Sequence, residues 1–367
     1  MLITGGAGFI GANFVHYWIK HHPADRLVLL DALTYAGNLA SLTPALNRST
    51  VIFVRGDIRN QELIEQLLRG HAITTVMHFA AESHVDRSIH GPDAFIETNV
   101  LGTHVLLKAA RKVWLEEGTA PAGARFYHVS TDEVYGSLDP EDPAFTEMSP
   151  FAPNSPYAAS KAAADHLVRA YHHTYDLPTT SSNCSNNYGP YQFPEKLIPL
   201  MIINALEGRS LPVYGDGLNV RDWLHVEDHC RALERVLLHG RVGEAYNVGG
   251  RNEWRNIDIV RLLCHMVDEA FRDDPLLAGR FPQAPAARGL ATETLLTFVR
   301  DRPGHDRRYA INNAKIEREL GVVPLERFES GIRKTLAWYL ENEAWWRGVM
   351  DGSYREWIQQ NYSVTSS

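Results

Sequence analysis

Two short segments of the chain combine residue types that could do acid–base chemistry. In the first, Tyr157 and Lys161 are four residues apart, so on a helix their side chains share one face. An ammonium beside a phenol favours the phenolate and lowers the tyrosine pKa from about 10. We expect such a phenolate to take the proton of a substrate hydroxyl while a hydride leaves the same carbon. Taken alone, this spacing is common and usually marks an ordinary surface helix.

The second segment places two carboxyls side by side, Asp132 and Glu133, directly after an apolar run that ends near Ser130. Ligands of parallel sheets bind at the carboxyl ends of the strands. Two neighbouring carboxyls can divide acid and base work if their surroundings separate their pKa values. The alternative interpretation is a solvated turn that caps the next segment. The position at a strand end favours the catalytic interpretation.

A glycine-rich turn near the start of the chain predicts a dinucleotide site. Gly5, Gly8 and Gly11 form a GxxGxxG pattern with a short apolar run before it and a helical pattern after it. Glycine permits the tight turn and the close approach of a pyrophosphate to the helix N-terminus. Asp31 follows 20 residues beyond Gly11, where a carboxylate accepts the ribose hydroxyls. No arginine directly follows Asp31, which favours NAD over NADP; the alternative is a glycine turn without a ligand.

The elements that must position these groups alternate along the first half of the chain. We expect strands at 2–4, 27–30, 51–54, 75–79, 126–130 and 178–184, and helices at 9–21, 61–69, 95–115 and 157–175. Such alternation predicts an α/β fold with a doubly wound parallel Rossmann sheet. The rhythm becomes irregular after about residue 185. We therefore expect a Rossmann domain over 1–185 and a smaller mixed α/β lobe over 186–367, with some later segments returning to the sheet.

Two parts of the second half are predicted individually. The stretch 272–297 is rich in Ala, Pro and Arg with weak periodicity, so we interpret it as a surface excursion. The stretch 328–362 has a helical pattern whose tryptophans predict a packing surface. They are Trp338, Trp345, Trp346 and Trp357.

Composition excludes several classes of function. The 367 residues contain 36 Lys and Arg against 44 Asp and Glu, a formal charge of -8. That balance offers no basic excess for a nucleic-acid partner. No apolar run approaches the roughly 18 residues of a membrane span. The chain has three cysteines and no CxxC pair, so we expect neither a disulfide framework nor a zinc ribbon, and a cytoplasmic location.

One pair of histidines has a spacing that could bind a metal. His225 and His229 are four residues apart, a spacing that can bind zinc on a helix. The glutamate placement of the metalloprotease motif is missing, and 226–239 has the pattern of an ordinary amphipathic helix. We expect no metal.

The glycine turn together with Tyr157 and Lys161 resembles the extended short-chain dehydrogenase/reductase family, many members of which act on nucleotide sugars. The Asp132–Glu133 pair makes the chain resemble the dTDP-glucose 4,6-dehydratases within it, because epimerases of this superfamily generally lack an adjacent Asp–Glu here. The resemblance runs from Leu2 to about Tyr362. Further matching blocks lie at 78–86, 185–190, 193–199, 221–223 and 301–306.

The resemblance implies conversion of dTDP-glucose to dTDP-4-keto-6-deoxyglucose and water. Tyr157 would take the proton of the glucose 4-hydroxyl while the C4 hydride passes to a tightly bound NAD that is regenerated each turnover. Glu133 would remove the C5 proton and Asp132 would protonate the departing C6 hydroxyl, after which the hydride returns to C6. Thr131 would hydrogen-bond the sugar 4-oxygen. The alternatives are a dehydratase or 4-epimerase acting on another nucleotide sugar, or an NAD-holding protein without turnover.

The resemblance also implies the binding residues and the assembly. Family members are usually homodimers that associate through helices, here those near 95–115 and 155–175. Lys196 and Arg221 would supply positive charge for the diphosphate. The implied cofactor contacts are Gly5, Gly8, Phe9, Ile10, Gly11, Asp31, Leu33, Thr34, Asp57, Ile58, Phe79, Ala80, Ala81, Ser83, Thr98, Tyr157, Lys161 and Asn187. The implied substrate contacts are Ser83, Thr131, Asn186, Lys196, Leu197, Pro212, Val213, Tyr214, Arg221, Asn256, Asp301, Arg302 and His305.

Overall fold

A computed structural model describes residues 1–120 and 122–350 of the chain, and its centre is a seven-stranded sheet. The order is β3-β2-β1-β4-β5-β6-β10, and every neighbouring pair is parallel. This is the doubly wound arrangement, with its switch point beside β1. The strands are β1 (Leu2–Thr4), β2 (Leu27–Asp31), β3 (Val51–Arg55), β4 (Thr75–His78), β5 (Arg125–Thr131), β6 (Thr179–Cys184) and β10 (Ala245–Val248).

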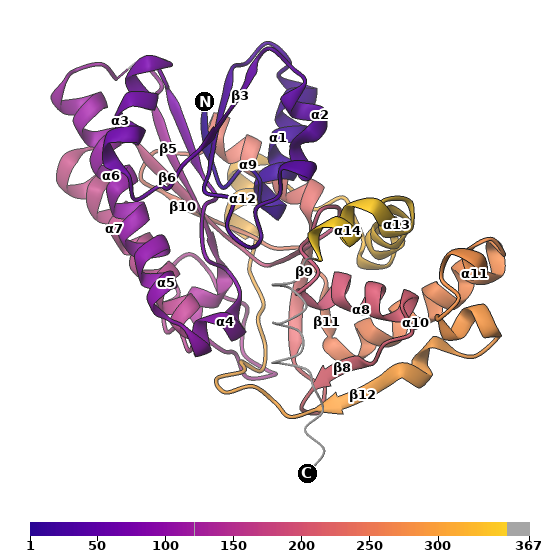
Figure 1. The fold of residues 1–367 in the computed structure, drawn as a ribbon. Coiled ribbons are helices and arrows are strands. Elements are labelled where there is room, and N and C mark those ends of the chain that lie inside the picture. Colours follow the sequence, from indigo (N-terminus) through magenta and orange to yellow (C-terminus); the bar gives the residue numbers. More distant parts are fainter. Residues whose placement is uncertain (121, 351–367) are drawn as a thin grey trace.

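Helices cover both faces of this sheet, which is why its central strands read as continuous apolar runs (Figure 1). On one face α1, α9 and α12 bury Phe14, Leu233 and Ile316. On the other face α3, α6 and α7 bury a second cluster around Leu107 and Val168. The helices of this part are α1 (Phe9–His21), η1 (Leu39–Leu42), α2 (Thr43–Leu46), α3 (Gln61–Gly70), α4 (Val85–His90), α5 (Asp93–Phe95), η2 (Ile96–Gly102), α6 (Thr103–Ala110), η3 (Arg111–Glu116), η4 (Asp132–Tyr135), α7 (Pro156–Tyr175), α9 (Val226–His239) and α12 (Ala314–Leu320).

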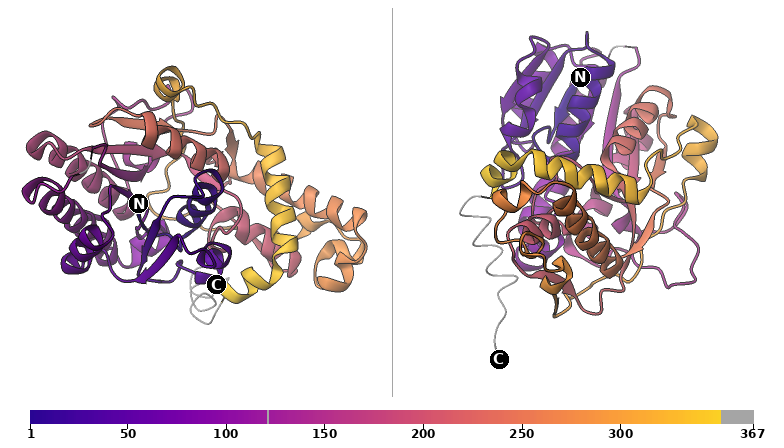
Figure 2. Two further views of the ribbon diagram at one scale, coloured as in Figure 1. Left: turned by 90° about the horizontal axis from the view of Figure 1, so that it is seen from above. Right: turned by 90° about the vertical axis from the view of Figure 1, so that its right-hand side faces the viewer.

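A second lobe lies beyond the carboxyl ends of the strands and has its own hydrophobic cluster (Figures 1 and 2). It contains a three-stranded sheet in the order β11-β9-β7 and a two-stranded sheet of β12 and β8. Its strands are β7 (Asn186–Tyr188), β8 (Leu211–Tyr214), β9 (Val220–His225), β11 (Glu253–Arg255) and β12 (Leu296–Val299). Its helices are α8 (Leu197–Leu206), α10 (Asn256–Asp273), α11 (Leu277–Arg280), η5 (Pro285–Arg288), η6 (Thr292–Leu295), α13 (Phe328–Glu341) and α14 (Glu343–Val349).

The predicted Rossmann sheet is confirmed, with strand and helix ends shifted by a residue or two. The helix predicted over 95–115 is one continuous run, 93–116, in which the π-helical stretches η2 and η3 flank α6. The prediction for 272–297 is wrong in part, because this stretch is not merely a surface excursion. Leu277, Phe281 and Ala284 are buried in the cluster of the second lobe; their spacing of four and three residues is helical but is hidden among Ala, Pro and Arg.

The tail follows the predicted helical pattern as far as the structure describes it. In α13 and α14, Trp338 and Trp345 pack beside the hydrophobic cluster of the second lobe, and Trp346 is buried in it. Trp357 and Tyr362 lie outside the described residues. Within 1–120 and 122–350, no helix is long and apolar enough to cross a membrane.

Candidate active site

Two adjoining cavities lie between the sheet and the second lobe. The larger, of about 440 Å³, borders the glycine turn and the carboxyl ends of the central strands. The smaller, of about 160 Å³, opens toward β8 and α8 in the second lobe. Both are lined by Glu133, Asn186, Asn187, Gln192, Glu195 and Lys196. The two therefore form one connected site, and Glu133 stands at the junction.

The glycine turn forms the cradle that its pattern predicts. Gly5 has φ +71°, and a Cβ there would lie 2.5 Å from the Ala80 backbone nitrogen. A Cβ on Gly11 would lie 2.2 Å from the Gly5 carbonyl oxygen. The helix α1 starts without a side-chain cap at Gly8, and its first residues line the larger cavity. Backbone can therefore approach a pyrophosphate at an uncapped helix N-terminus, so the residues fit a bound dinucleotide.

Asp31 and the residues after it form the next part of the wall. The Asp31 carboxylate accepts hydrogen bonds from the Ala7 and Leu33 backbone amides at 2.9 and 2.8 Å and lines the larger cavity. Leu33 itself, an implied cofactor contact, is not on that wall. Its backbone turns through φ +53°, and its side chain packs beside the sheet cluster. At this position the backbone, rather than the side chain, supports the site.

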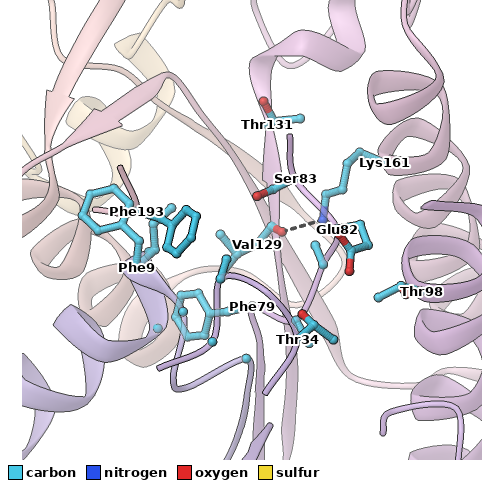
Figure 3. Close-up of a pocket in the computed structure, with 18 of the residues that line it drawn as sticks. Phe9, Thr34, Phe79, Glu82, Ser83, Thr98, Val129, Thr131, Lys161 and Phe193 are labelled. Atoms are coloured by element: carbon cyan, nitrogen blue, oxygen red, sulfur yellow. Dashed lines mark hydrogen bonds between the residues drawn. The ribbon is translucent and has the colours of Figure 1, made fainter. Parts of the chain in front are cut away.

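The catalytic pair predicted from spacing sits on α7. Ser155 caps this helix by accepting from the Ala158 amide at 3.1 Å, so that Tyr157 and Lys161 both line the larger cavity. The Lys161 ammonium donates to the Val129 carbonyl oxygen at 2.9 Å (Figure 3). The Thr131 side chain hydrogen-bonds to Tyr157. The cap and these two bonds fix the phenol and the ammonium near the carboxyl end of β5.

The expected lowering of the Tyr157 pKa is wrong for this structure. Burial raises that pKa well above its ordinary value, and the nearby Glu133 carboxylate adds to the rise. Burial also lowers the pKa of Lys161, whose ammonium is already bonded to a backbone carbonyl. Desolvation disfavours a buried phenolate more than the lysine favours it.

The adjacent carboxyls occupy the short turn η4 and face different surroundings. Glu133 lines both cavities, whereas Asp132 is 1% exposed and lines neither of them. Asp132 Oδ2 has no hydrogen-bond partner among the described residues. Burial, then Glu133 and Asp222, raises the pKa of Asp132 well above its ordinary range. Burial also raises the pKa of Glu133, but Arg302, Lys196 and Arg221 counteract that rise.

Three cations, the buried Arg221 and the half-buried Lys196 and Arg302, converge on the smaller cavity. Lys196 donates to the Ser83 carbonyl at 2.7 Å, Arg221 to the Asp306 carbonyl at 2.9 Å, and Arg302 pairs with Asp86 at 3.1 Å. Most of the implied substrate residues lie on this wall. Those on it are Asn186, Lys196, Leu197, Pro212, Val213, Tyr214, Arg221, Asn256 and Arg302.

Of the remaining implied contacts, some lie away from both cavities and the others line the larger one. Asp301 and His305 are not on either wall; they bond to each other at 2.6 Å, and the His305 ring lies 6.1 Å from the Tyr214 ring. The His pair considered for a metal is engaged elsewhere: His229 contacts Asn187 at 2.8 Å and His225 caps α9. In the described ranges no group of three or more His, Cys, Asp or Glu could hold a metal ion. The other implied contacts lining the larger cavity are Thr34, Asp57, Ile58, Phe79, Ala80, Ala81, Ser83 and Thr98 (some are labelled in Figure 3).

Several wall residues were missed by the sequence reasoning. They are Glu82, Glu97, Ser185, Phe193 and Glu195. Glu82, Ser185, Phe193 and Glu195 stand inside blocks already singled out as matching the family, and that was the available signal. Gln192 lies between two such blocks, and its Nε2 donates to the Asn187 carbonyl at 2.9 Å.

Comparison with known proteins agrees with this geometry. The family model described as GDP-mannose 4,6 dehydratase matches residues 2–335. The dTDP-glucose 4,6-dehydratases of Neisseria meningitidis and Xanthomonas campestris are 53% and 55% identical over 97% and 96% of this chain, and over 97% of each relative. The Streptomyces venezuelae dTDP-glucose 4,6-dehydratase, solved with NAD and dTDP bound, is 46% identical with a TM-score of 0.84, covering 95% of this chain and 99% of that one. The chain belongs to the family that this model describes, together with these dTDP-glucose 4,6-dehydratases.

Proposed function

We propose that this chain is an NAD-dependent dTDP-glucose 4,6-dehydratase, a lyase that forms dTDP-4-keto-6-deoxyglucose and water. One observation carries the proposal beyond the family: the two adjacent carboxyls lie in unequal surroundings next to the Tyr157 phenol. Glu133 faces the cavity junction among cations, while Asp132 is buried and its Oδ2 atom has no hydrogen-bond partner among the described residues. An elimination needs one ionised base and one protonated acid, and this arrangement can supply both.

The first step concerns the 4-hydroxyl of the sugar. Tyr157 accepts its proton, with Thr131 holding the 4-oxygen through the hydroxyl that also bonds to Tyr157. When bound, NAD supplies the acceptor of the C4 hydride and later its donor to C6. Burial raises the pKa of Tyr157, so forming the phenolate costs free energy. The positive charges of the Lys161 ammonium and of NAD, when bound, must together offset that cost.

The second step removes water across C5 and C6. The new 4-ketone acidifies the C5 proton, which Glu133 takes from the cavity junction. Asp132, whose pKa burial raises, gives its proton to the departing C6 hydroxyl from its position just behind the cavity walls, so that one water leaves and a C5–C6 double bond forms. Return of the hydride to C6 and of a proton to C5 completes the product. No net oxidation occurs, and the cofactor ends the turnover as it began.

Isotope tracing tests this proposal most directly. The purified protein is incubated with dTDP-glucose carrying deuterium at C4, and the product is analysed by mass spectrometry. We expect loss of water with the deuterium kept at C6, and a rate at least 10²-fold lower for Tyr157→Phe. UDP-glucose and GDP-mannose with the same label, run in parallel, decide the nucleotide. Recovery of an unchanged or epimerised sugar that retains its oxygen would overturn the assignment.

We also propose that the enzyme is a homodimer and works in the cytoplasm. The helical run 93–116 leaves Ile96 and Leu101 51% and 48% exposed, which favours a partner on that side. All three cysteines are free and buried, which is compatible with a reducing compartment. Sedimentation of the protein and of Ile96→Glu tests the dimer: we expect twice the chain mass for the first and the chain mass for the second. A monomer in both cases would overturn it.

A further inference from the structure

The loop that follows β2, residues 32–38, reaches from the sheet to the second lobe. It follows Asp31 at the carboxyl end of β2, yet Tyr35 and Ala36 pack against the hydrophobic cluster of the second lobe. On its inner side Thr34, Ala36 and Gly37 line the larger cavity. This loop, called the strap below, therefore spans the cavity and forms part of its wall.

Three side chains from three separate segments join at the strap. The Arg87 guanidinium of α4 lies 3.9 Å from the centre of the Tyr35 ring. Its Nε donates to Glu195 Oε2 at 3.1 Å, and Glu195 precedes α8. The Tyr35 hydroxyl hydrogen-bonds to the same Glu195 carboxylate. Each of the three groups thus contacts the other two.

The burial of this triad makes it costly to break. The Glu195 side chain is 1% exposed and that of Arg87 is 26% exposed. A buried carboxylate that loses its cation is left uncompensated, which is strongly unfavourable. The Tyr35 ring also meets Phe193 edge-on at 5.7 Å, and Phe193 lines the larger cavity beside the strap. Opening the strap would separate all of these groups together.

Two hydrogen bonds from α13 and α14, independent of the triad, hold the segments next to the strap. Trp345 of α14 donates from its indole nitrogen to Ser41 Oγ at 3.1 Å, and Ser41 lies in η1 just beyond the strap. The Tyr339 hydroxyl of α13 donates to the Gln192 carbonyl oxygen. Ser41, just beyond the strap, and Gln192, next to Phe193, are thereby fixed to the second lobe. The triad is the element whose release would let the strap move.

We propose that the strap, latched by Arg87, Tyr35 and Glu195, closes over NAD and retains it between turnovers, an inference that rests on the proposed function. The chemistry requires that the cofactor stay bound throughout each turnover. The hydride taken from C4 must be returned to C6 of the same sugar, so a reduced cofactor that escaped before water loss would strand the oxidised intermediate. Arg87 and Tyr35 line neither cavity. They act as positioning residues through the strap.

Cofactor release tests the latch without reference to activity. Holoenzyme loaded with isotopically labelled NAD is freed of excess label, mixed with a large excess of unlabelled NAD, and sampled for retained label over time. Arg87→Ala removes the cation, and Tyr35→Phe keeps the ring but removes its hydroxyl. Arg111→Ala is the matched control, because Arg111 also stacks on a tyrosine, Tyr175, at 4.0 Å and pairs with Glu116 at 2.8 Å, away from both cavities.

We expect release at least tenfold faster for Arg87→Ala and several-fold faster for Tyr35→Phe, with Arg111→Ala unchanged. During turnover both strap variants should leak free NADH and lose rate progressively until NAD is added. Release within twofold of the unmodified enzyme in the folded variants would overturn the latch while leaving the dehydratase assignment intact. A purified protein that retains no NAD at all would overturn both. If Arg87→Ala does not fold, Tyr35→Phe decides the question alone.

Discussion

At the scale of single residues, Asp132 should be catalytically useful at a cost in stability. Its pKa is raised well above the ordinary carboxyl value by burial, so the folded state binds this proton more tightly than the unfolded state does. The stability that the carboxyl contributes is present below about pH 4 and is lost as the pH rises toward its folded pKa. Asparagine keeps the size and carries no charge.

We therefore expect Asp132→Asn to melt at a higher temperature than the unmodified enzyme at pH 8, by about 1–2 °C for each kcal/mol gained in a chain of this length. The difference should shrink toward pH 5, and the dehydration rate should fall at least 10²-fold. Thermal melts of both proteins across this pH range check the prediction. Equal melting temperatures at pH 8 would mean that Asp132 reaches solvent in the ligand-free enzyme.

Glu133 should set the acidic limit of activity. It must be ionised to take the C5 proton, and burial raises its pKa although three cations counteract the rise. The rate should thus fall as the pH drops through a value above the ordinary 4.3 of a glutamate. A pH profile of kcat/KM measures that limb. Glu133→Gln should abolish exchange of the C5 proton with deuterated solvent, and Glu147→Gln, whose carboxylate accepts from the Asn247 amide, should leave it in place.

At the scale of elements, the glycine turn separates two effects that a glycine can have. Gly5 has φ +71° and faces the Ala80 backbone at 2.5 Å, whereas Gly118 has φ +64° with nothing within 4 Å. Alanine at either position meets the strain of a left-handed backbone, of order 1–3 kcal/mol, but only Gly5→Ala adds a clash at the cofactor cradle. We expect both variants to lose stability and only Gly5→Ala to lose NAD. Melting curves and the NAD content of the purified proteins check this.

The same scale shows what the sequence could predict. Elements with an uninterrupted pattern, such as β1 and α1, were found at their predicted ends because local spacing and burial agree there. The stretch 272–297 was misjudged because its buried residues are few and separated by small or charged ones. The π-helical stretches η2 and η3 carried no signal in spacing. In both cases tertiary packing decides the conformation.

The site shows the same division between local and long-range determinants. Tyr157, Lys161 and the glycine turn depend on local spacing and could be predicted from it. The pKa of Tyr157 could not, because it depends on burial by segments distant in the sequence and on the nearby Glu133 carboxylate. Nor could the placement of Asp301 and His305 away from the walls, since they bond to each other rather than to the cavity. Residues that act through contacts across the two lobes are not visible in a single sequence.

At the scale of the whole molecule, the cavities are bordered by residues of two hydrophobic clusters. One cluster belongs to the sheet and the other to the second lobe, and the strap is a crossing between them. A ligand bound in the larger cavity contacts residues of both lobes. NAD should therefore stabilise the two lobes as one cooperative unit, by about 2.7 kcal/mol at a hundred times its dissociation constant.

Removal of NAD should consequently lower the melting temperature and broaden or split the transition. Calorimetry of the holoenzyme and of the stripped protein, with NAD restored to half of the latter, measures this. Arg87→Ala should melt earlier than the unmodified enzyme even when both are stripped, because the buried Glu195 carboxylate loses its cation, and the difference should widen when both are loaded and diluted. A single sharp transition at one temperature in all samples would mean that protein contacts alone couple the two lobes. The cofactor would then contribute nothing to their stability as one unit.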